Sequence, residues 1–146
     1  MKVKTILFST ILFFVCATFS WGGTINEAAP AFSLKDLYGK TISLNDFHGS
    51  VVFINFWASW CAPCRQELPA LNRFIDKYKS GEAVVLAINV DKKRSNVDEF
   101  LDIIPGLSKN LHVLLDPGSN VIASFKARAM PTSFVIDKTG IIRHVH

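Results

Sequence analysis

The sequence predicts an α/β fold in which helices pack on a mixed central sheet. Two nearly continuous apolar runs, residues 50–57 and 83–90, are typical of strands that are buried on both faces. Each run precedes a segment with helical signals, and the chain closes with two strand-like segments around a turn. A length of 146 residues fits one domain, and 19% charged residues with abundant Val, Ile, Leu and Phe exclude intrinsic disorder.

The first 22 residues have the layout of a secretory signal peptide. Lys2 and Lys4 form a positive start, residues 5–19 carry no charge, and small residues suited to processing follow. The apolar run is shorter than the ~20 residues of a comfortable membrane span, and an uncleaved N-terminal membrane anchor is the alternative. Without this segment fourteen basic and twelve acidic residues remain, with one basic cluster at residues 92–94, so we expect no nucleic-acid partner. The expected location is periplasmic or otherwise extracytoplasmic.

A short linker at residues 23–30 leads into the domain, which we place at residues 31–146. Residues 31–37 and 40–44 flank a Tyr-Gly turn signal and predict a hairpin. The run at residues 50–57 follows as the first buried strand.

A helix is expected next, over residues 62–79, with Ser80-Gly81 ending it. Its apolar stripe, at alternating spacings of four and three, consists of Cys64, Leu68, Leu71, Ile75 and Tyr78. After the second buried strand, residues 95–104 predict a helix with Ser95 as its N-cap. The remaining expected elements are a strand at 113–115, a short helix at 119–125 and a final hairpin of residues 132–137 and 140–145.

Cys61 and Cys64 lie two residues apart at the start of the expected 62–79 helix. Unpaired amides and the helix dipole favour a thiolate there, and thiol pKa values at such positions fall to about 3.5–7.5 from about 8.5. Pro63 suits the first turn because it needs no hydrogen-bond acceptor there. Cys64 lies on the apolar stripe and should be buried, whereas Cys61 should be exposed and nucleophilic. One sulfur can then attack a disulfide while the other resolves the mixed disulfide.

A zinc half-site and a purely structural disulfide are the alternatives for this pair. Zinc normally requires four protein ligands, and the chain has no second Cys-x-x-Cys pair. His144 and His146 could be recruited, but their position at the very end of the chain makes a weak case. We therefore expect no metal and no other cofactor.

The segment FINFWASWCAPCRQELPAL, residues 53–71, resembles the active-site segment of the thioredoxin superfamily. More narrowly, it is similar to the exported TlpA/ResA-like thiol-disulfide oxidoreductases, and the resemblance runs from about residue 28 to the C-terminus. Met130-Pro131-Thr132 resembles the cis-proline loop that faces the disulfide in this family. The resemblance implies a thioredoxin-like fold with a mixed central sheet. The early hairpin and the long stretch between Cys64 and Pro131 resemble this group's N-terminal hairpin and central insertion.

The resemblance also implies roles for individual residues. Cys61 would attack the substrate, Cys64 would resolve the intermediate, and Glu67 would assist proton transfer; the alternative for Glu67 is an ordinary exposed helix residue. Asn55 stands where thioredoxin has a buried acid, so that base is absent here. Substrate contacts are implied for Trp60, Ala62, Pro63, Met130 and Pro131.

The chain departs from the family pattern at its end. Family members continue from the last strand into a further helix, whereas this sequence ends at His146. We therefore expect the C-terminal helix of the fold to be missing and one face of the sheet to be less covered.

The expected function is a protein disulfide reductase that acts outside the cytoplasm. Its substrates would be protein disulfides, and apocytochrome c is one candidate because some relatives reduce it before haem attachment. Keeping the pair reduced there would require a membrane electron donor of the thiol-disulfide relay type. Two alternatives stay open. A peroxiredoxin-like thiol peroxidase would place its cysteine behind a Thr in a Pro-rich loop, a pattern missing here, and a metal-binding chaperone would use Cys61, Cys64 and a histidine.

Overall fold

The computed structural model describes residues 24–146, so the expected signal segment at residues 1–22 lies outside the described residues. The strands are β1 (Ser33–Asp36), β2 (Thr41–Ser43), β3 (Val51–Trp57), β4 (Ala83–Asn89), β5 (Leu111–Leu115), β6 (Thr132–Ile136) and β7 (Ile142–Val145). The helices are α1 (Ala62–Ile75), α2 (Arg94–Leu101) and α3 (Asn120–Ser124), with a 3-10 turn, η1 (Leu44–Phe47).

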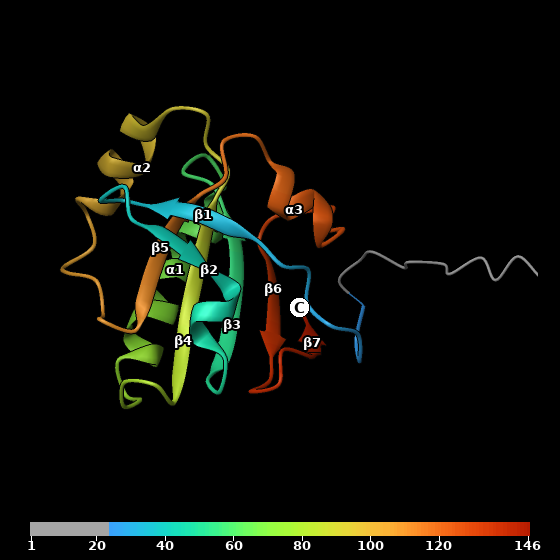
Figure 1. Cartoon of the computed structure of the whole chain (residues 1–146). Helices are drawn as coiled ribbons and strands as arrows, with labels where there is room; N and C mark the ends of the chain where they lie inside the picture. Colours follow the sequence, from blue (N-terminus) through green and yellow to red (C-terminus); the bar gives the residue numbers. More distant parts are fainter. Residues whose placement is uncertain (1–23) are drawn as a thin grey trace, which may run out of the picture.

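The seven strands form one mixed sheet in the order β2-β1-β5-β4-β3-β6-β7 (Figure 1). β4 runs parallel to both β3 and β5, whereas β6 runs antiparallel to β3 and to β7. Every residue of β4 is buried, which confirms the prediction of a strand covered on both faces. The thioredoxin-like α/β class and the N-terminal hairpin are confirmed as well.

The side chains of β3 alternate between two hydrophobic cores, one on each face of the sheet. Ile54 and Phe56 pack with α3 and η1, and the rings of Phe56 and Phe125 are 5.5 Å apart. Trp57, on the other face, packs with α1 and α2 and lies 5.2 Å from the ring of Phe100. In Figure 1, α1 lies behind the sheet and its first turn reaches the end where β3 and β4 terminate. The sheet therefore carries the start of α1 at the carboxyl end of its two most buried strands.

Helix α1 ends at Ile75, earlier than the predicted residue 79. The side-chain amide of Asn110 donates hydrogen bonds to the carbonyl oxygens of Ile75 (3.4 Å) and Tyr78 (2.8 Å). These bonds satisfy carbonyls that a longer helix would bond internally, so the chain leaves the helix and Tyr78 is 38% exposed.

Helix α2 begins at Arg94, and its N-cap is Lys93, so the prediction of Ser95 as N-cap is wrong. The Arg94 guanidinium donates to the carbonyl oxygen of Leu37 (2.9 Å) and pairs with Asp98 (2.7 Å). This side chain ties the first turn of α2 to the loop after β1.

The 3-10 turn η1 is not among the elements predicted from the sequence. Ser43 caps it, and the Asp46 carboxylate accepts from the Ser43 backbone amide at 2.8 Å. A serine followed three residues later by an acid is a capping-box signal that could have indicated this turn.

We expect His112, on β5, to make the stability of the domain depend on pH. Burial first, and nearby Lys40 second, lower the pKa of His112 from its usual value of 6.5, while Asp36 opposes the shift. Because the folded state favours neutral imidazole, the contribution of this group is fully present above pH 6.5 and is lost as the pH falls further. His112→Gln should therefore flatten this loss in urea unfolding measured from about pH 7 to 5.

The matched control for this prediction is His48→Gln, because His48 is an exposed histidine outside the strands. The control should keep the pH profile of the wild type. A His112→Gln profile that also follows the wild type would contradict the assignment.

Candidate active site

The Cys61–Cys64 pair lies where β3 gives way to α1. Cys61 is the N-cap of α1, with extended backbone angles (φ −85°, ψ 102°), and its Sγ accepts a hydrogen bond from the Cys64 amide at 3.3 Å. Pro63 occupies the first turn, as predicted. One amide of the first turn, that of Cys64, therefore points at the sulfur of Cys61, and it stabilises negative charge on that atom.

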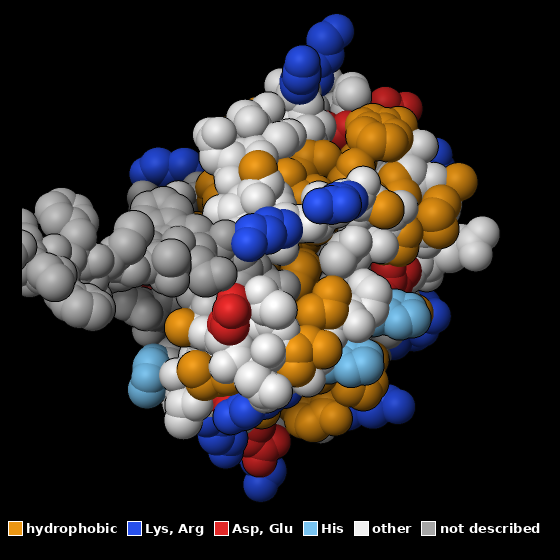
Figure 2. Space-filling model, turned by 90° about the vertical axis from the view of Figure 1, so that its right-hand side faces the viewer, with side chains coloured by type: hydrophobic (Ala, Val, Ile, Leu, Met, Phe, Trp, Pro, Cys, Tyr) orange, Lys and Arg blue, Asp and Glu red, His pale blue; other side chains and the backbone are white. Residues whose placement is uncertain are grey.

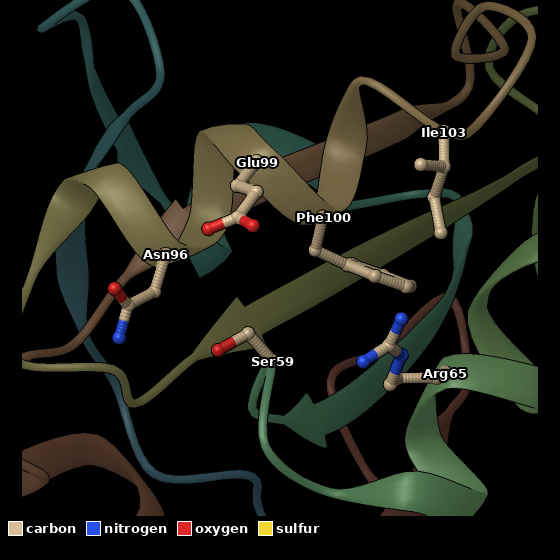
Figure 3. A pocket seen from close by; sticks show the side chains of 6 residues that line it. All are labelled: Ser59, Arg65, Asn96, Glu99, Phe100 and Ile103. Carbon is tan, nitrogen blue, oxygen red and sulfur yellow. The ribbon is translucent and has the colours of Figure 1, made fainter.

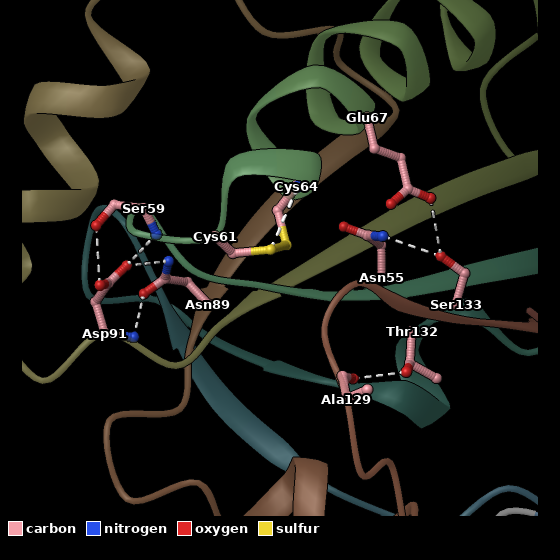
Figure 4. The surroundings of a disulfide bond; sticks show 10 residues. All are labelled: Asn55, Ser59, Cys61, Cys64, Glu67, Asn89, Asp91, Ala129, Thr132 and Ser133. Atoms are coloured by element: carbon pink, nitrogen blue, oxygen red, sulfur yellow. Dashed lines mark hydrogen bonds between the residues drawn. A yellow bond between two sulfur atoms is a disulfide. The ribbon is translucent and has the colours of Figure 1, made fainter.

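The two sulfurs form a disulfide with an S–S distance of 2.00 Å (Figure 4). Cys61 is 6% exposed and Cys64 is 1% exposed, so Cys61 is the more accessible of the two. The expectation that Cys61 is openly exposed is nevertheless wrong for the oxidised pair. Its side chain belongs to the core cluster that contains Trp57 and Ala58, and that packing covers it.

A partly buried hydrogen-bond network fixes the loop that carries the first cysteine. The carboxylate of Asp91, just after β4, accepts from the Ser59 amide (2.8 Å), the Ser59 hydroxyl (2.9 Å) and the Asn89 side-chain amide (2.7 Å). The Asp91 amide in turn donates to Asn89 Oδ1 at 2.8 Å. Figure 4 shows this cluster on the opposite side of the disulfide from Glu67.

Sequence reasoning missed Asp91, which is 5% exposed. The available signal was an acidic residue directly after the largely apolar run at residues 83–90. β3 and β4 are parallel, so the residues that follow them meet at one edge of the sheet.

Glu67 faces a second polar cluster, which connects α1 to the sheet (Figure 4). Its Oε1 accepts from the Ser133 hydroxyl at 3.4 Å, and the Ser133 oxygen accepts from Asn55 Nδ2 at 2.9 Å. Asn55 and Ser133 are register partners on β3 and β6.

Two oxygen atoms of this cluster, Glu67 Oε2 and Asn55 Oδ1, are buried without a hydrogen-bond partner. When Glu67 is ionised, both oxygens can only accept hydrogen bonds, so neither can satisfy the other. A protonated glutamate would supply one donor. Glu67 is half-buried, so the alternative of an ordinary exposed helix residue does not describe it. The cluster is therefore short of one hydrogen-bond donor while Glu67 is ionised.

The peptide bond between Met130 and Pro131 is cis, which confirms the expectation for this loop. Thr132, the first residue of β6, donates from its hydroxyl to the Ala129 carbonyl at 2.7 Å and closes the turn. The half-buried Met130 side chain packs against both hydrophobic cores, including the cluster that contains the two cysteines. The loop therefore lies at the same end of the sheet as the disulfide.

A groove of about 560 Å³ lies beside the active-site loop. Its lining includes Trp60, Met130, Ile122, Lys92 and Lys93. Trp60 is 69% exposed. Two predicted contact residues, Ala62 and Pro63, are exposed on the first turn of α1 but do not line this groove.

A smaller hollow of about 240 Å³ lies on the other side of the active-site loop, between α1 and α2 (Figure 3). Arg65 and Phe100 line it, and the guanidinium carbon is 5.6 Å from the ring centre. Ser59 forms another part of its wall, and Asn96 lines both this hollow and the groove.

Within residues 24–146, no three His, Cys, Asp or Glu side chains are grouped as a metal ion would require. His144 lies on β7, an edge strand, and His146 follows that strand; both are exposed. The cysteines are occupied by their mutual disulfide.

Comparison with known proteins gives consistent similarities. Residues 25–145 match the AhpC/TSA family. Thiol-disulfide oxidoreductase ResA of Bacillus cereus is 37% identical over 116 residues, which cover 80% of this chain and 65% of the relative. The chain thus spans about 65% of the length of such curated relatives.

Solved structures agree in fold. A Chlorobium tepidum protein assigned as thiol:disulfide interchange protein DsbE superposes with a TM-score of 0.77 at 37% identity, covering 84% of both chains. An exposed lipoprotein thioredoxin of Streptococcus pneumoniae superposes with a TM-score of 0.65 at 32% identity, covering 80% of this chain and 88% of that one.

Proposed function

This chain belongs to the AhpC/TSA family, and from that premise we propose that it is an extracytoplasmic thiol-disulfide oxidoreductase that reduces disulfides in other proteins. The observation that carries the proposal is the unequal cysteine pair at the start of α1. Cys61 caps the helix and accepts the Cys64 amide, while Cys64 is almost completely buried. Such asymmetry separates an attacking sulfur from a resolving one.

In the proposed reaction, the Cys61 thiolate attacks one sulfur of the substrate disulfide. The substrate S–S bond breaks, a Cys61–substrate disulfide forms, and the first substrate sulfur leaves as a thiolate that takes up a proton. Cys64, after losing its proton, attacks Cys61 Sγ, restores the Cys61–Cys64 bond and releases the second substrate sulfur. Two electrons and two protons pass to the substrate. The amide end of the helix stabilises the thiolate on Cys61 before the first step; in the second step Cys61 is the sulfur attacked and carries no charge.

Glu67 is proposed to accept the proton that Cys64 must lose. Its unpartnered buried oxygen and its hydrogen bond from Ser133 support this role. We propose that Trp60 and the cis loop at Met130-Pro131 contact the substrate chain. Trp60 and Met130 line the groove next to the loop that carries Cys61. Ala62 and Pro63 would contact it from the exposed first turn of α1.

We expect Glu67→Gln to keep the fold and to change the pH dependence of catalysis. Disulfide reduction should be slower than wild type by about tenfold near pH 6, and the rates should converge above about pH 8.5, where thiols ionise unaided. Insulin reduction measured from pH 5.5 to 9 tests this. Glu99→Gln, an exposed glutamate on α2, is the matched control and should follow wild type. Parallel profiles for wild type and Glu67→Gln would make Glu67 a structural residue.

The proposed compartment rests on the charge pattern of residues 1–22 and on similarity to an exposed lipoprotein. In this proposal residues 1–22 are the export signal or membrane anchor, residues 23–30 the linker and residues 31–146 the catalytic domain. In the described part of the chain, no helix has both the length and the apolar character needed to cross a membrane. The proposed partners are protein disulfides, with apocytochrome c as a candidate, and a membrane thiol-disulfide relay as electron donor.

The test of the function is reduction of insulin disulfides by the full chain with dithiothreitol as electron donor, alongside hydrogen peroxide consumption by the reduced protein. We expect insulin reduction well above the dithiothreitol background. Peroxide consumption should be no faster than with Cys61→Ser. Rapid peroxide turnover without disulfide reduction would overturn the proposal in favour of a thiol peroxidase.

A further inference from the structure

The groove beside the active-site loop has an apolar floor built from three separate parts of the chain. Trp60 comes from the loop before α1, Ile122 from α3, and Met130 from the loop before β6. Trp60 is 69% exposed although it immediately precedes Cys61. Apolar side chains that adjoin one another in a groove are typical of a surface where another molecule makes contact.

The rim of the groove is positively charged. Lys92 and Lys93 line it and are exposed. Among residues 24–146 the ion pairs are Arg94–Asp98 and Arg143–Asp137, so neither lysine is neutralised by an ion pair within the domain. Two more exposed cations, Lys126 and Arg128, lie in the segment that leads to Met130. Figure 2 shows Lys and Arg side chains around hydrophobic patches in the upper part of one face.

The one carboxylate that lines the groove is not available for direct contact with a partner. Asp91 also lines the groove, but it is 5% exposed. Both of its oxygens already accept hydrogen bonds, from Ser59 and from the Asn89 amide. A partner in the groove would therefore meet the lysine ammonium groups and the apolar floor.

We propose that this groove selects acidic peptide segments, in which an apolar side chain adjoins the disulfide and carboxylates flank it. This inference rests on the proposed disulfide-reducing function and names its substrate class. The apolar residue would lie against Trp60 and Met130, and the carboxylates would face Lys92 and Lys93. Charge complementarity of this kind raises association rates and disfavours partners of the wrong sign.

The experiment compares two disulfide-linked peptides that share one apolar residue beside the cysteine. Glutamates flank the disulfide in one peptide and lysines in the other. Single-turnover reduction by the dithiothreitol-reduced, desalted full chain gives a second-order rate constant for each. At about 20 mM salt we expect a preference of about tenfold for the acidic peptide, and at about 0.5 M salt the preference should nearly vanish.

Charge-reversal variants locate the selecting residues. Lys92→Glu/Lys93→Glu should reverse the preference, and Lys92→Gln/Lys93→Gln, the milder pair, should abolish it. The control, Lys77→Glu/Lys79→Glu, makes the same change in net charge just beyond the opposite end of α1, and should keep the wild-type preference.

A small neutral disulfide, bis(2-hydroxyethyl) disulfide, distinguishes failure of the proposed disulfide-reducing function from failure of the proposed selection for acidic peptides. Its reduction rate reports the intrinsic reactivity of Cys61 in wild type and in each double variant, and the peptide rates are divided by it. If wild type reduces neither this compound nor the peptides, the proposed function fails. If it reduces them without charge preference, or if the control pair shifts the preference as much as the groove pair, the acidic-peptide groove is wrong.

Discussion

Replacing Cys61 with serine should abolish the reduction of protein disulfides, with a loss of about 10³-fold or more, because no accessible nucleophile then remains at the helix end. Cys64 is 1% exposed and cannot reach a protein substrate. Cys64→Ala should instead attack once and remain attached to the substrate, because nothing resolves the mixed disulfide. Insulin turnover measures the first effect, and mass spectrometry under non-reducing conditions detects the adduct. The chain has a third cysteine, Cys16, within residues 1–22, so each variant should also carry Cys16→Ala to leave Cys61 and Cys64 as the only thiols.

Alkylation of the reduced protein gives an independent measurement of the same assignment. Cys61 should react with iodoacetamide much faster than Cys64 near neutral pH, since its sulfur lies at the amide end of α1 and is the more exposed. Peptide mapping by mass spectrometry resolves the two sites. Faster modification of Cys64, or a stable substrate adduct on Cys61→Ser in place of Cys64→Ala, would reverse the roles of the two residues.

Asp91→Ala should destabilise the domain by about 2–4 kcal/mol, a large fraction of the ~5–15 kcal/mol that holds a typical domain folded. The substitution removes the acceptor of three hydrogen bonds and leaves a buried donor on Asn89 and two partly buried donors on Ser59 without partners. It also frees the loop that presents Trp60 and Cys61. Urea unfolding at pH 7 measures the change in free energy.

Asp98→Ala is the matched control for Asp91. Asp98 pairs with Arg94 on the surface of α2, and an exposed pair of this spacing is worth about 0.3–0.5 kcal/mol. The Asp91→Asn variant keeps one acceptor oxygen and should fall between Asp91→Ala and wild type. If Asp91→Ala and wild type unfolded at the same midpoint concentration of urea, the Asp91 network would not be what holds the loop.

The sequence alone was sufficient for the elements whose signals are local. The nearly continuous apolar runs at residues 50–57 and 83–90 predicted two strands buried on both faces, and β3 and β4 occupy nearly those residues. A cysteine pair followed by an apolar stripe placed the reactive sulfurs at a helix start. In the structure Cys61 is the N-cap of α1 and Pro63 lies in its first turn. This agreement is expected because capping depends on residues within one turn of each other.

Tertiary structure decided the features whose partners are distant in the chain. The end of α1 at Ile75 depends on Asn110, and the active-site loop depends on Asp91, which is 32 positions from Ser59. Asn55 and Ser133 are 78 positions apart and meet only because β3 and β6 pair. The low exposure of Cys61 likewise comes from packing against its cluster. Local periodicity carries no information about which strands become neighbours, so these polar contacts and the depth of the sulfur could be found only in the folded domain.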